Sequence, residues 1–122
     1  MKKIITLPLP DAKLSPNARI HWAQKSKITK AHRMNARLVS QCSGLKAKTK
    51  IISYRLFFFW KDKRRHDRDN ASASCKAYLD GVSDAIGQDD SEWEFDGVRF
   101  GIDRDNPRVE IHAEIKTAKP ED

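Results

Sequence analysis

Runs of apolar residues divide the chain into four strand-like and two helix-like segments. In residues 109–115, apolar side chains alternate with polar ones, which is typical of a strand with one face in solvent. The pattern predicts an α+β fold, in which a small mixed β-sheet of about four strands packs with two main helices. The strands are expected over residues 4–7, 51–60, 95–102 and 109–115, and the helices over residues 24–40 and 70–86.

The segment "IISYRLFFFW", residues 51–60, is apolar almost throughout. Such a run predicts a central strand that is covered on both faces. Its aromatic residues are therefore expected in the core rather than in a platform that stacks bases. Trp22, Trp60 and Trp93 are also expected to serve packing, and Trp93 is the best candidate among them for stacking on DNA.

Each predicted helix has an apolar face. In residues 24–40 this face is expected to comprise Ile28, Ala31, Leu38 and Val39. Another face carries Lys30, Arg33 and Arg37, which either meet phosphates or are simply solvated. In residues 70–86, Asn70 suits the N-cap. The buried stripe of this second helix is expected to comprise Cys75, Leu79, Val82 and Ile86.

The composition is that of one soluble globular domain over residues 1–122, with 39% hydrophobic and 34% charged residues. The start, "MKKIITLPLP", lacks the apolar run of a signal peptide, and no stretch is long enough for a membrane span. Cys42 and Cys75 belong to no metal-binding pattern and are expected to be reduced thiols. We therefore expect a cytoplasmic protein.

The net charge of +7 is unevenly distributed. Residues 12–61 contain many Lys and Arg residues but no Asp or Glu, and all acids except Asp11 follow from Asp62 onward. A basic half of this kind favours binding of a polyanion, most often a nucleic acid. The alternative is a basic protein whose charge serves only solubility.

The tetrapeptide Asp-Arg-Asp-Asn occurs twice, at residues 67–70 and 103–106. The second copy precedes Pro107 between two predicted strands, where Asp, Asn and Pro favour a hairpin turn. The first copy follows the most apolar strand and opens a helix. In an extended chain Asp67 and Asp69 would point to the same side.

Two close carboxylates can be held together by Mg²⁺, which prefers oxygen ligands. The loop after the second helix supplies Asp89 and Asp90 as further ligands. The neighbouring residues Arg64, Arg65 and Arg68 could bind phosphates beside the metal. Alternatively, these arginines only neutralise the aspartates in surface ion pairs.

Lys76 shares a helix face with Asp80, away from the predicted buried stripe. It could stabilise negative charge at a scissile phosphate. Alternatively, Lys76 and Asp80 form an ordinary ion pair between helix positions i and i+4.

The stretch "DRDNASASCKAYLDGVSDAIGQDDS", residues 67–91, resembles the RusA family of Holliday-junction resolvases, which are small bacterial and phage endonucleases. It has the family's Asp-x-Asp-Asn, a helical lysine, Leu-Asp-Gly and Asp-Asp-Ser. The segment "LSPNARIHWAQKSK", residues 14–27, looks like the N-terminal region of a phage-type branch. In better-known members the lysine comes three residues after the asparagine. That position is Ala73 here, and Lys76 lies about one helical turn later.

The resemblance implies a homodimer that cleaves four-way DNA junctions with Mg²⁺, for which Mn²⁺ substitutes, and without an organic cofactor. It assigns Asp67, Asp69 and Asp90 as catalytic metal ligands, Asp89 as a supporting acid and Lys76 as the catalytic lysine. DNA-binding candidates are Lys25, Lys27, Lys30, Arg33, Arg37, Arg64, Arg65 and Arg68. Two other functions stay open, namely a non-catalytic nucleic-acid-binding protein and a metal-dependent nuclease for RNA or other branched DNA.

Overall fold

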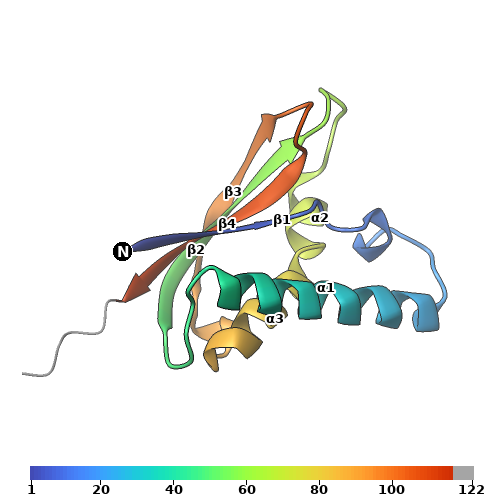
Figure 1. The fold of residues 1–122 in the computed structure, drawn as a ribbon. Helices are drawn as coiled ribbons and strands as arrows, with labels where there is room; N and C mark the ends of the chain where they lie inside the picture. Colours follow the sequence, from blue (N-terminus) through green and yellow to red (C-terminus); the bar gives the residue numbers. More distant parts are fainter. Residues whose placement is uncertain (117–122) are drawn as a thin grey trace, which may run out of the picture.

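A computed structural model describes residues 1–116, which form a four-stranded mixed sheet packed with two main helices (Figure 1). The strand order is β1-β4-β2-β3, with β2 and β3 parallel and the other pairs antiparallel. The predicted α+β fold is therefore confirmed. The strands are β1 (Lys2–Leu7), β2 (Lys50–Trp60), β3 (Glu94–Ile102) and β4 (Arg108–Lys116). The helices are α1 (Trp22–Cys42), α2 (Arg68–Ala73) and α3 (Lys76–Ile86), with 3₁₀ turns η1 (Ala12–Leu14) and η2 (Asp90–Glu92).

The core lies on one face of the sheet. In β4, Val109, Ile111, Ala113 and Ile115 are buried, whereas the intervening residues are not. This is the alternation that the sequence predicted for a strand with one covered face. The buried side chains of α3 complete this core and include the whole predicted stripe of Cys75, Leu79, Val82 and Ile86.

β2 lies inside the sheet, as predicted, but no helix among the described residues covers its second face. Leu56 and Phe58 are fully buried, while Phe57 and Phe59 on the other face are half-buried. The ring of Phe57 packs against His112 at 4.1 Å, and the Arg108 guanidinium lies 4.0 Å from the centre of the Phe59 ring. The prediction that a second layer of the protein covers this face was wrong. The two rings are shielded instead by polar side chains of the neighbouring strand β4.

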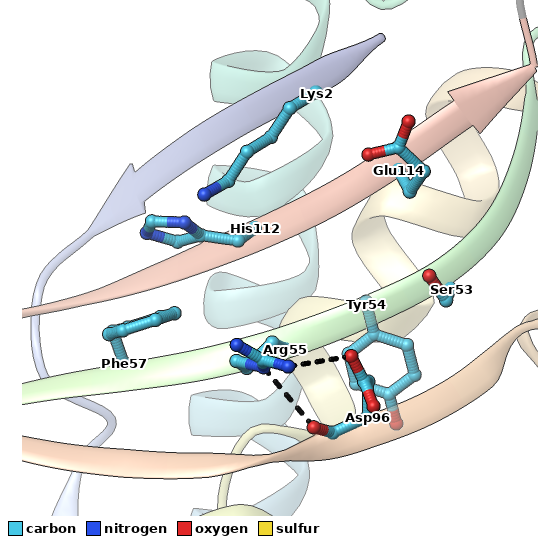
Figure 2. Close-up of a pocket in the computed structure, with 8 residues that line it drawn as sticks. All are labelled: Lys2, Ser53, Tyr54, Arg55, Phe57, Asp96, His112 and Glu114. Carbon is cyan, nitrogen blue, oxygen red and sulfur yellow. Dashed lines mark hydrogen bonds and ion pairs between the residues drawn. The ribbon is translucent and has the colours of Figure 1, made fainter.

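The open face of the sheet has a shallow hollow of about 190 Å³ (Figure 2). Arg55 of β2 reaches across to the Asp96 carboxylate of β3 at 2.8 Å. His112 borders the hollow and hydrogen-bonds Glu110 at 2.9 Å, and its side chain is only 12% exposed. The hollow contains none of the predicted site residues, and its charged side chains include cations and anions in similar number.

α1 and α3 pack together on the covered face through small residues. A Cβ added to Gly81 would lie 2.2 Å from the Arg33 carbonyl oxygen and 2.7 Å from the Ala36 Cβ. Ala36 and Ser40 are the buried residues of α1, whereas Leu38 is 51% exposed. The predicted apolar face of this helix is therefore confirmed only in part, because Ile28 and Val39 are half-buried, with Val39 packed against the core, whereas Ala31 and Leu38 are exposed. The side-chain pattern of α1 could not show that its partner presents a glycine.

The predicted helix over residues 70–86 consists of two helices. The α2 helix ends at Ala73, and the hydroxyl of its C-cap Ser74 donates to the Ala71 carbonyl at 2.6 Å. Cys75 is the N-cap of α3 and makes no side-chain cap hydrogen bond. Local hydrogen bonds from serine compete with the helical pattern and favour such a break. Asn70 was wrongly predicted as the N-cap, because Asp67 accepts the hydrogen bond that caps α2.

The two thiols should differ sharply in reactivity. Cys75 is fully buried, and burial raises the pKa of its thiol to about 12, whereas Cys42 is exposed. Because the thiolate is the reactive form, the folded protein should react with a disulfide reagent at Cys42 only. Titration should count one thiol per chain in buffer and two in denaturant. Rapid reaction of both thiols in buffer would contradict this packing of α3.

None of the helices in the described part of the chain is long and apolar enough to cross a membrane.

Candidate functional site

Both Asp-Arg-Asp-Asn copies make the same local turn. Asp67 accepts a hydrogen bond from the backbone N–H of Asn70 at 2.9 Å, and Asp103 accepts one from Asn106 at 3.2 Å. Asp side chains commonly stabilise turns and helix starts in this way. This shared hydrogen bond explains why both copies begin with Asp and end with Asn. A catalytic role for either copy must therefore be argued from the residues that lie around it.

The second copy is a turn, as predicted, but not a hairpin. It connects β3 to β4, and these strands do not pair with each other because β2 lies between them. The backbone N–H of Asp103 donates to the Trp60 carbonyl at the end of β2, and Arg108 holds the Asp103 carboxylate at 2.7 Å. Hydrogen bonds from Arg108 lower the pKa of Asp103. This copy is structural.

The first copy follows the loop after β2 and opens α2, with Asp67 as the N-cap and residues 68–70 in the helix. Asp67 has an extended backbone, but Asp69 lies in the first helical turn, so the two residues are not in the extended arrangement assumed from the sequence. Both are exposed. Clefts beside the carboxyl ends of parallel strands, here β2 and β3, are common ligand sites.

Lys76, at the start of α3, contacts the loop that follows this helix. Its ammonium lies 2.5 Å from the Asp90 carboxylate and 3.0 Å from that of Asp80. The predicted pair with Asp80 is therefore present, and the contact with Asp90 brings together two residues that the resemblance assigned to one site. Hydrogen bonds to Asp90 and Asp80 raise the pKa of Lys76 and keep it protonated at neutral pH.

Asp89, the predicted supporting acid, is next to Asp90 in the chain and within electrostatic reach of Lys76. It is exposed and accepts a hydrogen bond from the Ser91 backbone N–H at 2.9 Å, which caps the short η2 turn. This hydrogen bond lowers the pKa of Asp89. Asp89 thus caps η2 while its carboxylate stays near the pair of Lys76 and Asp90.

The carboxylates predicted to bind Mg²⁺ suit the ion in chemistry but are not gathered around one point. Among residues 1–116, no three His, Cys, Asp or Glu side chains form a group that could hold a metal. Asp67 and Asp69 nevertheless offer exposed oxygens, and Asp80 and Asp90 already attract one cation, the Lys76 ammonium. Carboxylate oxygens of this kind are hard ligands that Mg²⁺ accepts together with several waters.

Two hollows follow α2 and meet at Ser74. One, of about 310 Å³, is lined by Asp67 and Asn70 together with Arg65 and His66. The other, of about 340 Å³, is lined by Lys76, Asp80 and Lys25 of the basic helix α1. Lys25 and Lys76 thus line one hollow, which the sequence could not show.

The other predicted DNA-binding residues differ in whether they form ion pairs with acidic side chains. Arg33 holds Asp84 of α3 through two bonds of 2.6 and 2.8 Å, so it links the helices rather than facing solvent freely. This pairing lowers the pKa of Asp84. Arg64 lies 3.8 Å from Asp62, and Arg65 lines the hollow over Asp67. In the described part of the chain, no ion pair is formed by Lys25, Lys27, Lys30 or Arg37.

The prediction that the tryptophans serve packing is confirmed for Trp93 and Trp60 but not for Trp22. Trp93 is 6% exposed and meets Tyr54 edge-on at 5.9 Å, so it is a core residue and not a stacking platform. Trp22 is 76% exposed, although it was expected to pack. Trp60 packs against Phe58 but also stacks on His66 at the surface. The sequence did not predict this aromatic pair.

No family model matches the chain. The chain is similar to an "Uncharacterized protein" from Xylella fastidiosa strain Temecula1, with 38% identity over 90 residues. The match covers 70% of this chain and 59% of that relative, so the chain spans less than two thirds of the relative's length. The comparison names no activity, and the function must be proposed from the site.

Proposed function

We propose that the protein is a Mg²⁺-dependent endonuclease that resolves four-way DNA junctions by paired nicks in recombination and repair, in the cytoplasm. The observation that carries this proposal is the contact between Lys76 and Asp90 beside the α2 helix, at whose start Asp67 and Asp69 lie. These four residues are the ones that the RusA resemblance assigns to catalysis.

In this proposal Asp67, Asp69 and Asp90 hold one or two Mg²⁺ ions when DNA is bound, and Mn²⁺ substitutes. The metal would activate a water and stabilise the charge on the leaving oxygen. No organic cofactor is required.

Lys76 has a separate role. A lysine ammonium is protonated at neutral pH, so Lys76 would act by electrostatic stabilisation of the phosphate. In the free protein it neutralises Asp80 and Asp90. The distribution of charge also suits a polyanionic substrate, since Lys25 of α1 lines the same hollow as Lys76.

A homodimer would suit this reaction. Resolution needs two nicks in strands of like polarity, and a twofold dimer presents two identical sites symmetrically. Basic residues of α1 and of the segment before α2 would hold the arms through phosphates, with recognition of branched shape rather than of base edges.

Replacement of Lys76 by methionine should slow junction cutting by about a hundredfold, because one preorganised charge at the phosphate is lost. Junction binding, measured in EDTA, should weaken only slightly. The matched control is Lys46→Met, which removes an exposed lysine in the loop between α1 and β2 and should cut normally. Equal cutting by both variants would exclude Lys76 from the reaction.

The test of the function is a gel assay on a synthetic four-way junction, with Mg²⁺ or with EDTA. Replication forks, flaps, linear duplex, single strands and RNA serve as competing substrates. The proposal predicts cutting of the junction in Mg²⁺ and no product in EDTA. Salt-sensitive binding without a Mg²⁺-dependent product would instead identify a non-catalytic nucleic-acid-binding protein. Preferred cutting of forks, flaps or RNA would keep the chemistry and change the substrate.

A further inference from the structure

A further hollow lies where β2 and β3 end, next to the candidate site. Its volume is about 550 Å³, within the range of small-molecule sites. Ile102, which is 52% exposed, contributes apolar surface. The hollow is lined by Trp60, Asp62, Lys63, Arg64, Arg65, His66, Arg68, Phe100, Gly101 and Ile102.

Aromatic rings form one wall of this hollow. The His66 ring stacks on Trp60, with 3.5 Å between ring centres and 6° between planes. Phe100 meets Trp60 edge-on at 5.4 Å.

The rim of the hollow is strongly basic. Lys63, Arg64, Arg65 and Arg68 face a single acid, Asp62. The Arg68 guanidinium lies 5.5 Å from the centre of the Phe100 ring. A flat aromatic wall next to several cations is complementary to a ligand that combines a planar ring with a phosphate.

We propose that this hollow binds one unpaired nucleotide of the DNA substrate, with the base against the His66–Trp60 stack and its phosphate among the arginines. The inference rests on the proposed function in that the ligand is DNA. A hollow of this size accommodates a single nucleotide but not a duplex. Because His66 directly precedes Asp67, a nucleotide held there keeps the adjoining phosphates close to the start of α2.

The test measures binding in EDTA, where no cutting takes place. A short labelled oligothymidine is compared with an oligomer of the same length in which every base is replaced by an abasic site. Stacking of one base is worth about 1–3 kcal/mol, so the protein should bind the base-bearing oligomer about tenfold more tightly. His66→Ala should remove most of this preference and leave the affinity for the abasic oligomer unchanged.

Three further variants make the test specific. His66→Phe keeps a ring and should retain the preference, which separates loss of stacking from loss of folding. His21→Ala removes an exposed histidine that lies 5.7 Å from Trp22, and it should leave the preference intact. Arg65→Gln should lower the affinity for both oligomers equally, because the proposed contact of Arg65 is to phosphate.

The inference is wrong if the wild type binds both oligomers equally, or if His66→Ala keeps the full preference. These results are independent of cleavage. If the protein cuts junctions but shows no preference for base-bearing DNA, the proposed function stands and the proposed nucleotide site in this hollow is wrong. A base preference in a protein that cuts nothing would support the hollow and contradict the nuclease.

Discussion

Asp69→Asn should abolish Mg²⁺-dependent cutting of a four-way junction while leaving junction binding intact. Asp69 is exposed in the first turn of α2, and its replacement keeps the size of the side chain while removing its charge. Loss of one charged metal ligand should slow cutting about a hundred- to thousandfold. The rate is measured with end-labelled strands, and binding is measured separately in EDTA.

The chain contains its own control for this experiment. Asp105 occupies the same place in the second Asp-Arg-Asp-Asn copy and is also exposed. Asp105→Asn should cut at the wild-type rate, because that copy only connects β3 to β4. Normal cutting by Asp69→Asn would remove Asp69 from the mechanism.

Gly81→Ala should destabilise the protein by about 2–3 kcal/mol, since overpacking of a tight contact commonly costs this much. The new methyl group would lie 2.2 Å from a backbone oxygen of α1, which cannot rotate away as a side chain can. Alanine favours a helix by up to about 1 kcal/mol over glycine, so packing must outweigh propensity. For a domain of this size the melting temperature should fall by about 10 °C.

Gly87→Ala is the matched control. No atom lies within 4 Å of a Cβ at Gly87. The substitution should therefore lower the stability only through the backbone φ of 73°, by about 1–2 kcal/mol. Melting is followed by circular dichroism. If Gly81→Ala were as stable as the wild type, α1 and α3 could not approach each other as closely as the structure shows.

The strands were predictable because their patterns are local. Val109, Ile111, Ala113 and Ile115 alternate with polar residues, and this alternation alone indicates a half-covered strand. The buried face of α1 was not predictable, since Ala36 and Ser40 carry little hydrophobic signal and Gly81 of α3 lets the backbone approach Ala36 closely. The rings of Phe57 and Phe59 indicated a second covering layer, but His112 and Arg108 cover them instead.

The candidate site was predictable only in part. The sequence indicated Lys76 and Asp90, and the fold brings them into contact. It suggested that Asp67 and Asp69 converge, but the backbone changes from extended to helical between them, so this geometry is lost. The stack of Trp60 and His66 joins the end of a strand to the following loop, and no local pattern encodes it.

Paired cleavage of a cruciform is the most direct measurement of the central claim. A supercoiled plasmid that extrudes a four-way junction is incubated with the protein, in Mg²⁺ or in EDTA, and its topology is read on an agarose gel. The account predicts direct conversion to linear plasmid in Mg²⁺, because two symmetric sites nick opposing strands within one complex. A plasmid that stays supercoiled in Mg²⁺ while the protein is bound would contradict the account.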